Sequence, residues 1–181
     1  MDEILEPGRI ELVEMDNTSR DSDRTAANVT LQKTNYRVNI LVNSTGIIAL
    51  PKLEYTKDGF EIQFGVNRLA RFLLFELLKP ALEANASPES SSRVVNLSSS
   101  AHYIAGINQP DDYNFEKSEY NDWVAFGQSK TAKIYIANNI DRYYRSRILY
   151  YKCLSWRNCN GICAVYRSCK GGSTEKRQKD I

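Results

Sequence analysis

The chain has 181 residues, of which 42% are hydrophobic and 25% are charged, and its net charge is +2. These values are ordinary for a globular protein, and the length suits one domain with a sizeable core rather than two independent domains. Seven basic and two acidic side chains follow Tyr150, but they are scattered and form no periodic face. We interpret them as a solvated end, so no nucleic-acid partner is expected.

No secretory signal or membrane span is visible. The first residues, "MDEILEPGRIELVEMD", lack a basic stretch followed by an apolar one. The most apolar run, "FLLFELL", is short and interrupted by Glu76. We therefore expect a cytoplasmic protein without a membrane span.

All four cysteines lie near the carboxyl end, at Cys153, Cys159, Cys163 and Cys169. Their spacing is wider than the paired ligands of most zinc ribbons, and His102, the only histidine, is far away in sequence. A zinc site stays open as an alternative, but reduced thiols and no metal are the prediction.

The amino-terminal half predicts strands that alternate with helices. Residues Arg9 to Asp16 alternate apolar and charged side chains, which indicates a strand. Ser19 then predicts the N-cap of an amphipathic helix. Tyr36 to Asn43 is β-branched and apolar on both faces, as in a buried parallel strand. Residues 60–82 place apolar side chains at three- and four-residue steps, which indicates a long helix.

Arg93 to Ser99 predicts a second buried strand, and a polar insertion separates it from a helix that carries Phe126 and Lys130. The stretch "ILYYKCL", from Ile148, could form another strand, whereas the last 27 residues show no period and are expected to be irregular. The alternation predicts an α/β fold with a parallel sheet over residues 1–147. Residues 148–181 are predicted to be a divergent, poorly ordered tail, rich in cysteine and basic.

Phe126 and Lys130 are spaced i, i+4, so on a helix their side chains lie on one face. A tyrosine at position 126 would be a proton donor whose pKa the lysine could lower. A phenyl ring offers no ionisable group, so the pair has the form of a catalytic dyad with one member removed.

Several of these features occur in an order typical of one family. Asp16 ends a strand, "NSTG" follows an apolar strand at Asn43 to Gly46, Asn67 lies inside a long helix, and "RVVNLSSSAH" precedes "FGQSKTA". From about Gly8 to Arg147 the sequence resembles the short-chain dehydrogenase/reductase family, in particular its retinol-dehydrogenase-like fungal branch. The resemblance implies a doubly wound, Rossmann-like parallel sheet.

The resemblance also implies roles at an alcohol or carbonyl redox site that works with NADP or NAD. Ser99 would polarise the substrate oxygen, and Lys130 would hold the nicotinamide ribose. Asn67 would support a water that relays protons to the lysine. Phe126 stands at the position of the family's tyrosine. The residues implied at the adenosine end of the cofactor are Asp16, Asn43 and Gly46.

Each polar residue also has a purely structural interpretation. Ser99 could be a strand-end turn former, Lys130 a solvated helix lysine and Asn67 a buried amide. Asp16 could be a helix-cap acid. Order and spacing favour family membership over these readings, but they do not establish activity.

The sequence departs from the family before Arg9, where a first strand, a glycine-rich turn and a second strand are expected but only eight residues stand. Without that turn, no helix N-terminus can bind the cofactor's pyrophosphate. The expected fold is therefore an incomplete sheet lacking its first two strands. Either Arg9 to Met15 pairs directly with Tyr36 to Val42, or apolar faces stay exposed.

Two functions follow as hypotheses. The first is an oxidoreductase that interconverts a secondary alcohol and a ketone or aldehyde, weak or inactive in this chain. The second is a non-catalytic remnant that binds a protein partner, such as a homologous subunit whose sheet edge it could extend.

Overall fold

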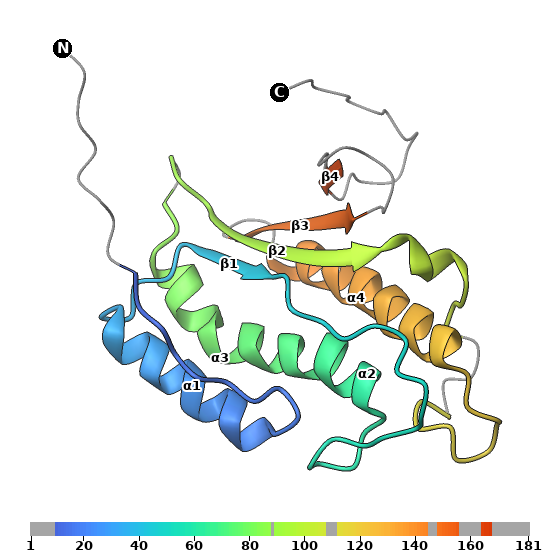
Figure 1. The fold of residues 1–181 in the computed structure, drawn as a ribbon. Coiled ribbons are helices and arrows are strands. Elements are labelled where there is room, and N and C mark those ends of the chain that lie inside the picture. Colours follow the sequence, from blue (N-terminus) through green and yellow to red (C-terminus); the bar gives the residue numbers. More distant parts are fainter. Residues whose placement is uncertain (1–9, 88, 108–111, 145–147, 156–163, 168–181) are drawn as a thin grey trace.

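The structure is a computed structural model that describes residues 10–87, 89–107, 112–144, 148–155 and 164–167 (Figure 1). Its centre is a sheet in the order β1-β2-β3-β4. Strands β1 (Ile40–Asn43), β2 (Ser92–Ser99) and β3 (Ile148–Ser155) are parallel. Strand β4 (Ala164–Arg167) pairs antiparallel to β3. The predicted parallel sheet is confirmed for β1, β2 and β3.

The principal helices lie on the same side of the sheet (Figure 1). Helix α1 (Arg20–Lys33) begins at Ser19, whose side chain accepts a hydrogen bond from the Ser22 amide, as the sequence predicts. The predicted long helix consists of α2 (Ile62–Phe64), a π-helical turn over Gly65–Leu69, and α3 (Ala70–Ala84). Helix α4 (Asp122–Tyr144) packs against β2 and β3.

The hydrophobic core lies between this layer of helices and the sheet. Phe75 and Leu82 of α3 are fully buried, as is Val94 of β2. Leu41 of β1 and Ile140 of α4 belong to the same cluster. Burial of such aliphatic and aromatic side chains is the main favourable term in the folding of the chain.

The predicted strand from Arg9 to Asp16 is wrong where the structure describes it, because residues 10–16 form no strand. Ile10 and Leu12 are 88% and 90% exposed. A strand needs a neighbour for its peptide groups, and residues 10–16 form no ladder with the expected partner, β1, whose neighbour in the described sheet is β2. Direct pairing of the two segments therefore does not occur, and apolar side chains remain in contact with solvent.

The other boundaries also differ from expectation. Strand β1 starts at Ile40 rather than Tyr36. Asn35 and Tyr36 adopt left-handed backbone conformations with φ of 50° and 58°, which excludes Tyr36 from a strand. The possible strand at Ile148 is confirmed as β3. The sheet thus continues past the predicted domain boundary at residue 147, and β4 lies within the predicted tail. The predicted disorder of residues 156–163 and 168–181 falls outside the described residues.

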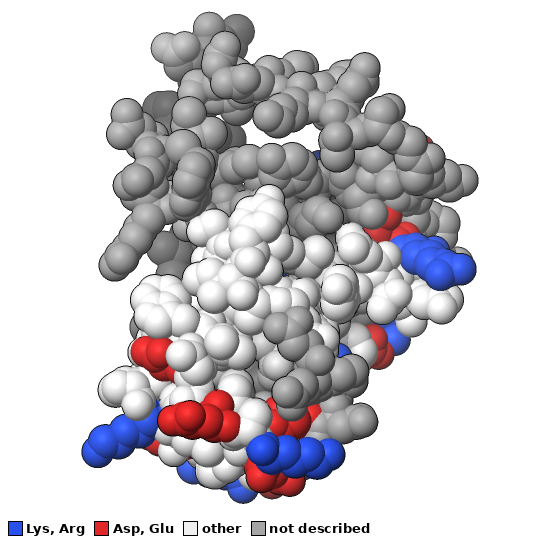
Figure 2. All heavy atoms as spheres, turned by 90° about the vertical axis from the view of Figure 1, so that its right-hand side faces the viewer, with Lys and Arg blue, Asp and Glu red and all other residues white. Residues whose placement is uncertain are grey.

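None of the helices in the described residues is long and apolar enough to cross a membrane. On the face seen in Figure 2, acidic and basic side chains of the described residues are interspersed and form no large patch of one sign.

Candidate functional site

Asn67 lies at the centre of the site, in the π-helical turn that joins α2 to α3. Its Oδ1 accepts a hydrogen bond from the Ile47 amide at 2.9 Å, and its Nδ2 donates to the Ile47 carbonyl at 3.0 Å and to Ser129 Oγ at 2.9 Å. The side chain therefore joins the loop after β1 to helix α4. π-Helical turns often occur at functional sites, and the hydrophobic pattern of the sequence does not reveal this one.

Gly46 permits a close approach between this loop and Asn67. A Cβ atom at position 46 would lie 2.8 Å from Asn67 Oδ1 and 3.4 Å from Lys130 Nζ. The first separation is shorter than any real contact of a Cβ atom. The structure thus brings Gly46, Asn67 and Lys130 together, although they are far apart in sequence.

The Lys130 ammonium also faces the residue four positions before it. Its Nζ lies 5.2 Å from the centre of the Phe126 ring, within the range of a cation–π interaction. Lys130 is buried, so the interpretation as a solvated helix lysine is wrong. Burial, together with the neighbouring charge of Arg71, lowers the pKa of Lys130 to about 8.

A second buried lysine, Lys133, was not anticipated from the sequence. It is 1% exposed and donates to the Leu97 carbonyl at 3.2 Å. Burial, with the charges of Lys130 and Arg71, lowers its pKa to about 7. A lysine one turn from another on a helix is usually solvated, and only the tertiary structure places this one against β2.

Arg71 and Asp23 complete this group of buried charges. Arg71 Nε and Nη2 have no hydrogen-bond partner, nor has either carboxylate oxygen of Asp23. Burial raises the pKa of Asp23 to about 6, against the opposing effect of Arg71. Burial also lowers the pKa of Arg71, which the charge of Asp23 partly offsets.

Ser99 is the N-cap of the 3₁₀ turn Ser100–Tyr103, and its Oγ accepts a hydrogen bond from the Ala101 amide at 3.2 Å. This contact matches the structural interpretation of Ser99 as a turn former. The preceding serine is tied directly to the lysine, since Ser98 Oγ donates to the Lys130 carbonyl at 3.0 Å. Ser98 therefore fixes the backbone of α4, and Ser99 lies at the adjoining end of β2.

Asn43 lies at the end of β1, and Asp16 lies in the segment before α1. Asn43 Nδ2 donates to Asn96 Oδ1 at 2.7 Å, while Asn43 Oδ1 is buried without a partner. The Asp16 carboxylate accepts from Lys57 Nζ at 2.8 Å and from the amide and hydroxyl of Thr18 at 2.9 and 2.7 Å. Lys57 first, and then Thr18, lower the pKa of Asp16 to about 2.

A nicotinamide dinucleotide fits some of these residues better than others. At the lysine end, the loop at Gly46 lies close against Asn67 and the Lys130 ammonium, so the three residues implied there are together. The unpartnered Asn43 Oδ1 could accept a hydrogen bond. The adenosine end of the cofactor fits Asp16 less well, because the Asp16 carboxylate already accepts hydrogen bonds from Lys57 and Thr18.

Two other features of the described residues lie outside this group. A cavity of about 530 Å³ is lined by Phe64, Arg68, Tyr113, Tyr135 and neighbouring residues, and Lys130 is not among them. No group of three or more histidine, cysteine, aspartate or glutamate residues in the described part could hold a metal ion. Cys159, Cys163 and Cys169 lie outside it, so the zinc alternative is untested.

Several curated proteins are similar in sequence. The chain is 46% identical over 148 residues to a short-chain dehydrogenase/reductase, prx1, of Penicillium roqueforti, a match that covers 82% of this chain and 42% of that protein. It is 44% identical over 106 residues to retinol dehydrogenase 13 of Homo sapiens, which covers 59% of this chain and 30% of the relative. The chain thus spans less than half the length of these relatives. No protein-family model matches it.

Solved structures agree in fold. An uncharacterized protein from Mycobacterium paratuberculosis is 30% identical with a TM-score of 0.72, and the match covers 83% of this chain and 52% of that one. The NADPH-bound carbonyl reductase from chicken fatty liver is 22% identical with a TM-score of 0.56, covering 77% and 56% of the two chains. These neighbours match the parallel sheet and its helices. In sequence and in fold, the chain belongs to the short-chain dehydrogenase/reductase family, and it represents part of that fold.

Proposed function

We propose that this chain carries the lysine side of an oxidoreductase site that interconverts a secondary alcohol and a ketone or aldehyde. As it stands, the chain turns over such a substrate weakly or not at all. The observation that supports this proposal is the position of the Lys130 ammonium, 5.2 Å from the centre of a phenyl ring where the family has a phenol.

The resemblance assigns roles to the residues around this pair. Ser99 would donate a hydrogen bond to the substrate oxygen, and Lys130 would bind the nicotinamide ribose. Asn67 would hold a water near the lysine; its contacts to Ile47 and Ser129 keep its amide fixed for that purpose. A bound NADP or NAD would supply the hydride chemistry, and no residue of this chain replaces it.

The missing hydroxyl limits the chemistry. Reduction of a carbonyl requires a proton on its oxygen, and Phe126 has none to give. General acid catalysis by a positioned side chain contributes roughly 10²–10⁴-fold, which corresponds to about 3 to 5 kcal/mol of transition-state stabilisation. Ser99 can polarise a carbonyl but does not replace that donor.

Cofactor affinity is the second limit. The part of the chain that the structure describes contains no glycine-rich turn between a strand and a helix, and such a turn supplies most of the amides that bind a pyrophosphate. We expect no binding of NADPH or NADH above background when the purified chain is titrated and cofactor fluorescence is recorded. Micromolar affinity, abolished in Lys130→Met but kept in Lys117→Met on the polar insertion, would contradict this expectation.

A second function is favoured by a different observation. Strand β1 is an edge of the described sheet, and Ile40 and Val42 on it are 54% and 55% exposed. Such an edge accepts further strands readily. A non-catalytic, cytoplasmic interaction protein that binds a homologous subunit would use it. Crosslinking the chain to a full-length relative, followed by mass spectrometry of the linked peptides, tests this function; the absence of a specific link contradicts it.

A further inference from the structure

The cavity of about 530 Å³ has a mostly apolar wall. The segment before α3, the polar insertion and helix α4 form this wall, and its aromatic and aliphatic side chains include Phe60, Phe64, Leu69, Tyr113, Tyr135 and Ile136. Cavities of this volume hold small organic molecules in many proteins. Lys130 and Phe126 are not among the described residues that line it, so the cavity is separate from the proposed redox site.

Arg68 is the basic side chain of the cavity wall, and two aromatic rings position it. Its guanidinium carbon lies 5.4 Å from the centre of the Phe64 ring and 5.8 Å from the centre of the Phe72 ring. Both distances are within the range of a cation–π interaction. The rings come from the residues four before and four after Arg68. They fix the place of the guanidinium but accept none of its N–H groups in a conventional hydrogen bond.

The guanidinium of Arg68 lacks a counter-ion in the part of the chain that the structure describes. Its Nε is buried without a hydrogen-bond partner, and the ion pairs among the described residues do not include Arg68. Burial lowers the pKa of Arg68, an effect that the nearby phenol of Tyr113 partly offsets. A partly buried cation without a paired anion is costly, so a bound anion at this position would be favoured.

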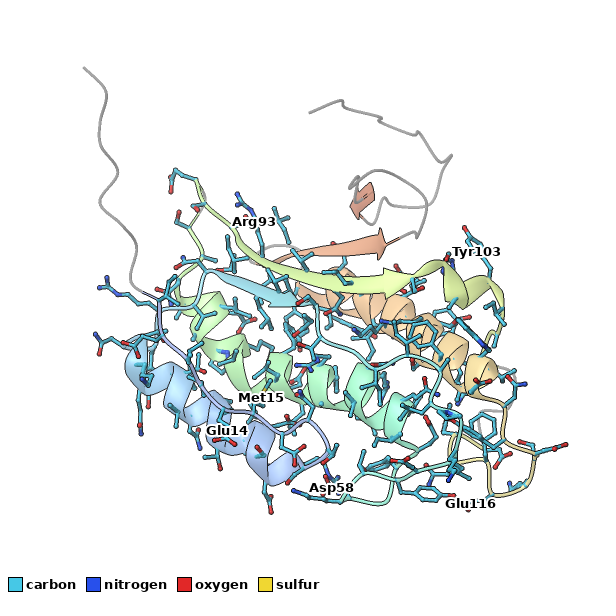
Figure 3. All side chains as sticks on the ribbon, in the orientation of Figure 1. Glu14, Met15, Asp58, Arg93, Tyr103 and Glu116 are labelled. Carbon is cyan, nitrogen blue, oxygen red and sulfur yellow. The ribbon has the colours of Figure 1, made fainter. Side chains whose placement is uncertain are left out.

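Two other polar side chains of the wall are already used by the protein. Asp112 accepts hydrogen bonds from the Glu116 amide at 2.7 Å and from Ser118 Oγ at 2.6 Å. Asn114 Oδ1 accepts from the Glu61 amide at 2.9 Å. These contacts hold the polar insertion beside the start of α2, at the end of the molecule where Glu116 is labelled (Figure 3). Asp112 and Asn114 therefore shape the cavity, and Arg68 keeps its donors for a ligand.

The charges of the wall select the kind of anion. Arg68 contributes one positive charge, whereas Asp112 and Glu116 contribute two negative charges. Two carboxylates repel a dianion, such as a phosphate monoester, more strongly than a monoanion. A carboxylate carries one charge, and its two oxygens match two N–H groups of a planar guanidinium. The aromatic side chains around Arg68 favour an apolar body behind that carboxylate.

We propose that this cavity binds a small monocarboxylate with an aromatic or branched apolar body, and that the carboxylate pairs with the guanidinium of Arg68. The apolar body would lie against Phe64, Tyr113 and Tyr135. Such a ligand would supply the anion that Arg68 lacks and would cover apolar wall side chains at the same time.

The test compares two probes that share one ring system. The purified 181-residue chain is titrated with 2-naphthaleneacetate and with the neutral 2-naphthaleneacetamide, and binding is measured by calorimetry. We expect the acid to bind at least tenfold more tightly than the amide, because the amide lacks the charge-assisted hydrogen bonds. In ¹⁵N NMR, the acid should shift the Nε–Hε resonance of Arg68. Equal affinities, no shift of this resonance, or no binding of the acid at millimolar concentration overturns the proposal.

A third probe tests the choice of charge. We expect 2-naphthyl phosphate to bind more weakly than 2-naphthaleneacetate at pH 8, where the phosphate ester is a dianion. Tighter binding of the phosphate overturns the monocarboxylate as the ligand class.

Arg68→Met removes the guanidinium, and Arg142→Met is its matched control. Arg142 on α4 also lies beside a ring, 6.0 Å from the centre of Tyr143, but it does not line the cavity. We expect Arg68→Met to keep its circular dichroism and to bind the acid at least tenfold more weakly, whereas Arg142→Met binds it as the parent does. Unchanged affinity in folded Arg68→Met, or an equal loss in both variants, overturns the proposal.

Arg68→Lys provides a variant that keeps the positive charge. It loses the two-point geometry of the guanidinium, so we expect it to bind 2-naphthaleneacetate at least threefold more weakly than the parent. It takes the place of Arg68→Met if that variant does not fold. Parent-like affinity in Arg68→Lys overturns the pairing of the carboxylate with the guanidinium.

Discussion

The ammonium of Lys130 lies over the ring of Phe126, with 5.2 Å between Nζ and the ring centre. The lysine thus retains an aromatic neighbour but not a phenol whose pKa it could lower. A cation–π contact stabilises a buried ammonium and carries out no proton transfer. The relationship explains how the proposed site can keep an aromatic contact for the lysine without the hydroxyl.

Restoring the hydroxyl alone should not restore activity. We expect Phe126→Tyr to give no ketone-dependent oxidation of NADPH above that of Phe126→Leu, because cofactor binding remains weak. Robust turnover by Phe126→Tyr would contradict the proposed limit on cofactor binding.

Gly46→Ala should destabilise the chain through Asn67. The new Cβ would lie 2.8 Å from Asn67 Oδ1, so the amide must move and its two hydrogen bonds to Ile47 weaken. We expect a loss of about 1–3 kcal/mol in urea unfolding. In an Asn67→Ala background the same change should cost much less, since the obstructing oxygen is gone. Additive effects of the two substitutions would disprove the contact.

Stability should pass through a minimum between pH 6 and 7. The pKa of Asp23 is raised from 3.8 to about 6, so the folded chain binds the extra proton and stability falls as pH rises through this range. The pKa of Lys133 is lowered from 10.5 to about 7, so the unfolded chain binds the extra proton and stability rises above pH 7. Urea unfolding from pH 5 to 9 measures both the fall in stability toward pH 6, the acid limb, and the rise above pH 7, the alkaline limb.

Single substitutions should separate the two limbs. Lys133→Met is expected to remove the rise in stability that begins at pH 7 and to leave the later rise due to Lys130, whose pKa is lowered to about 8. It is also expected to raise the free energy of unfolding at pH 7 by on the order of a few kcal/mol, because a buried charge is replaced by an apolar side chain. Asp23→Asn is expected to flatten only the acid limb. A pH profile of Lys133→Met identical to that of the parent would show that Lys133 is not the group responsible.

Removal of the Lys57 side chain should raise the pKa of the Asp16 carboxyl. Lys57 is the first cause of the pKa of about 2, ahead of the hydroxyl of Thr18. In Lys57→Met we expect this pKa to rise toward the usual value of 3.8, as measured by carboxyl-carbon NMR titration. Lys52→Met on the same loop is the control. No change would mean that the contact with Thr18 dominates.

The sequence predicts the parallel strands, the cap at Ser19 and the helix pair that carries Asn67 and Lys130, because these depend on local patterns. It fails at residues 10–16, where the alternating pattern is present but the neighbouring strand that would bond it is not. Local periodicity indicates what a segment could form, and pairing decides whether it does.

The site residues also differ in how far the sequence predicts their positions. The spacing of Phe126 and Lys130 predicts that they share a helix face, and the structure shows them in contact. The burial of Lys133 and Arg71 has no signal in the sequence, since lysine and arginine on a helix are usually solvated. The pKa of such a group depends on which elements pack over it, and this information is absent from a single segment.

The exposed side chains of Ile40 and Val42 on β1 also bear on the stability of the chain against degradation in a cell. Ile40 and Val42 are exposed apolar side chains. Chaperones and proteases recognise side chains of this kind on unfolded polypeptides. Two exposed β-branched side chains on an edge strand are therefore a liability for the lifetime of the folded chain.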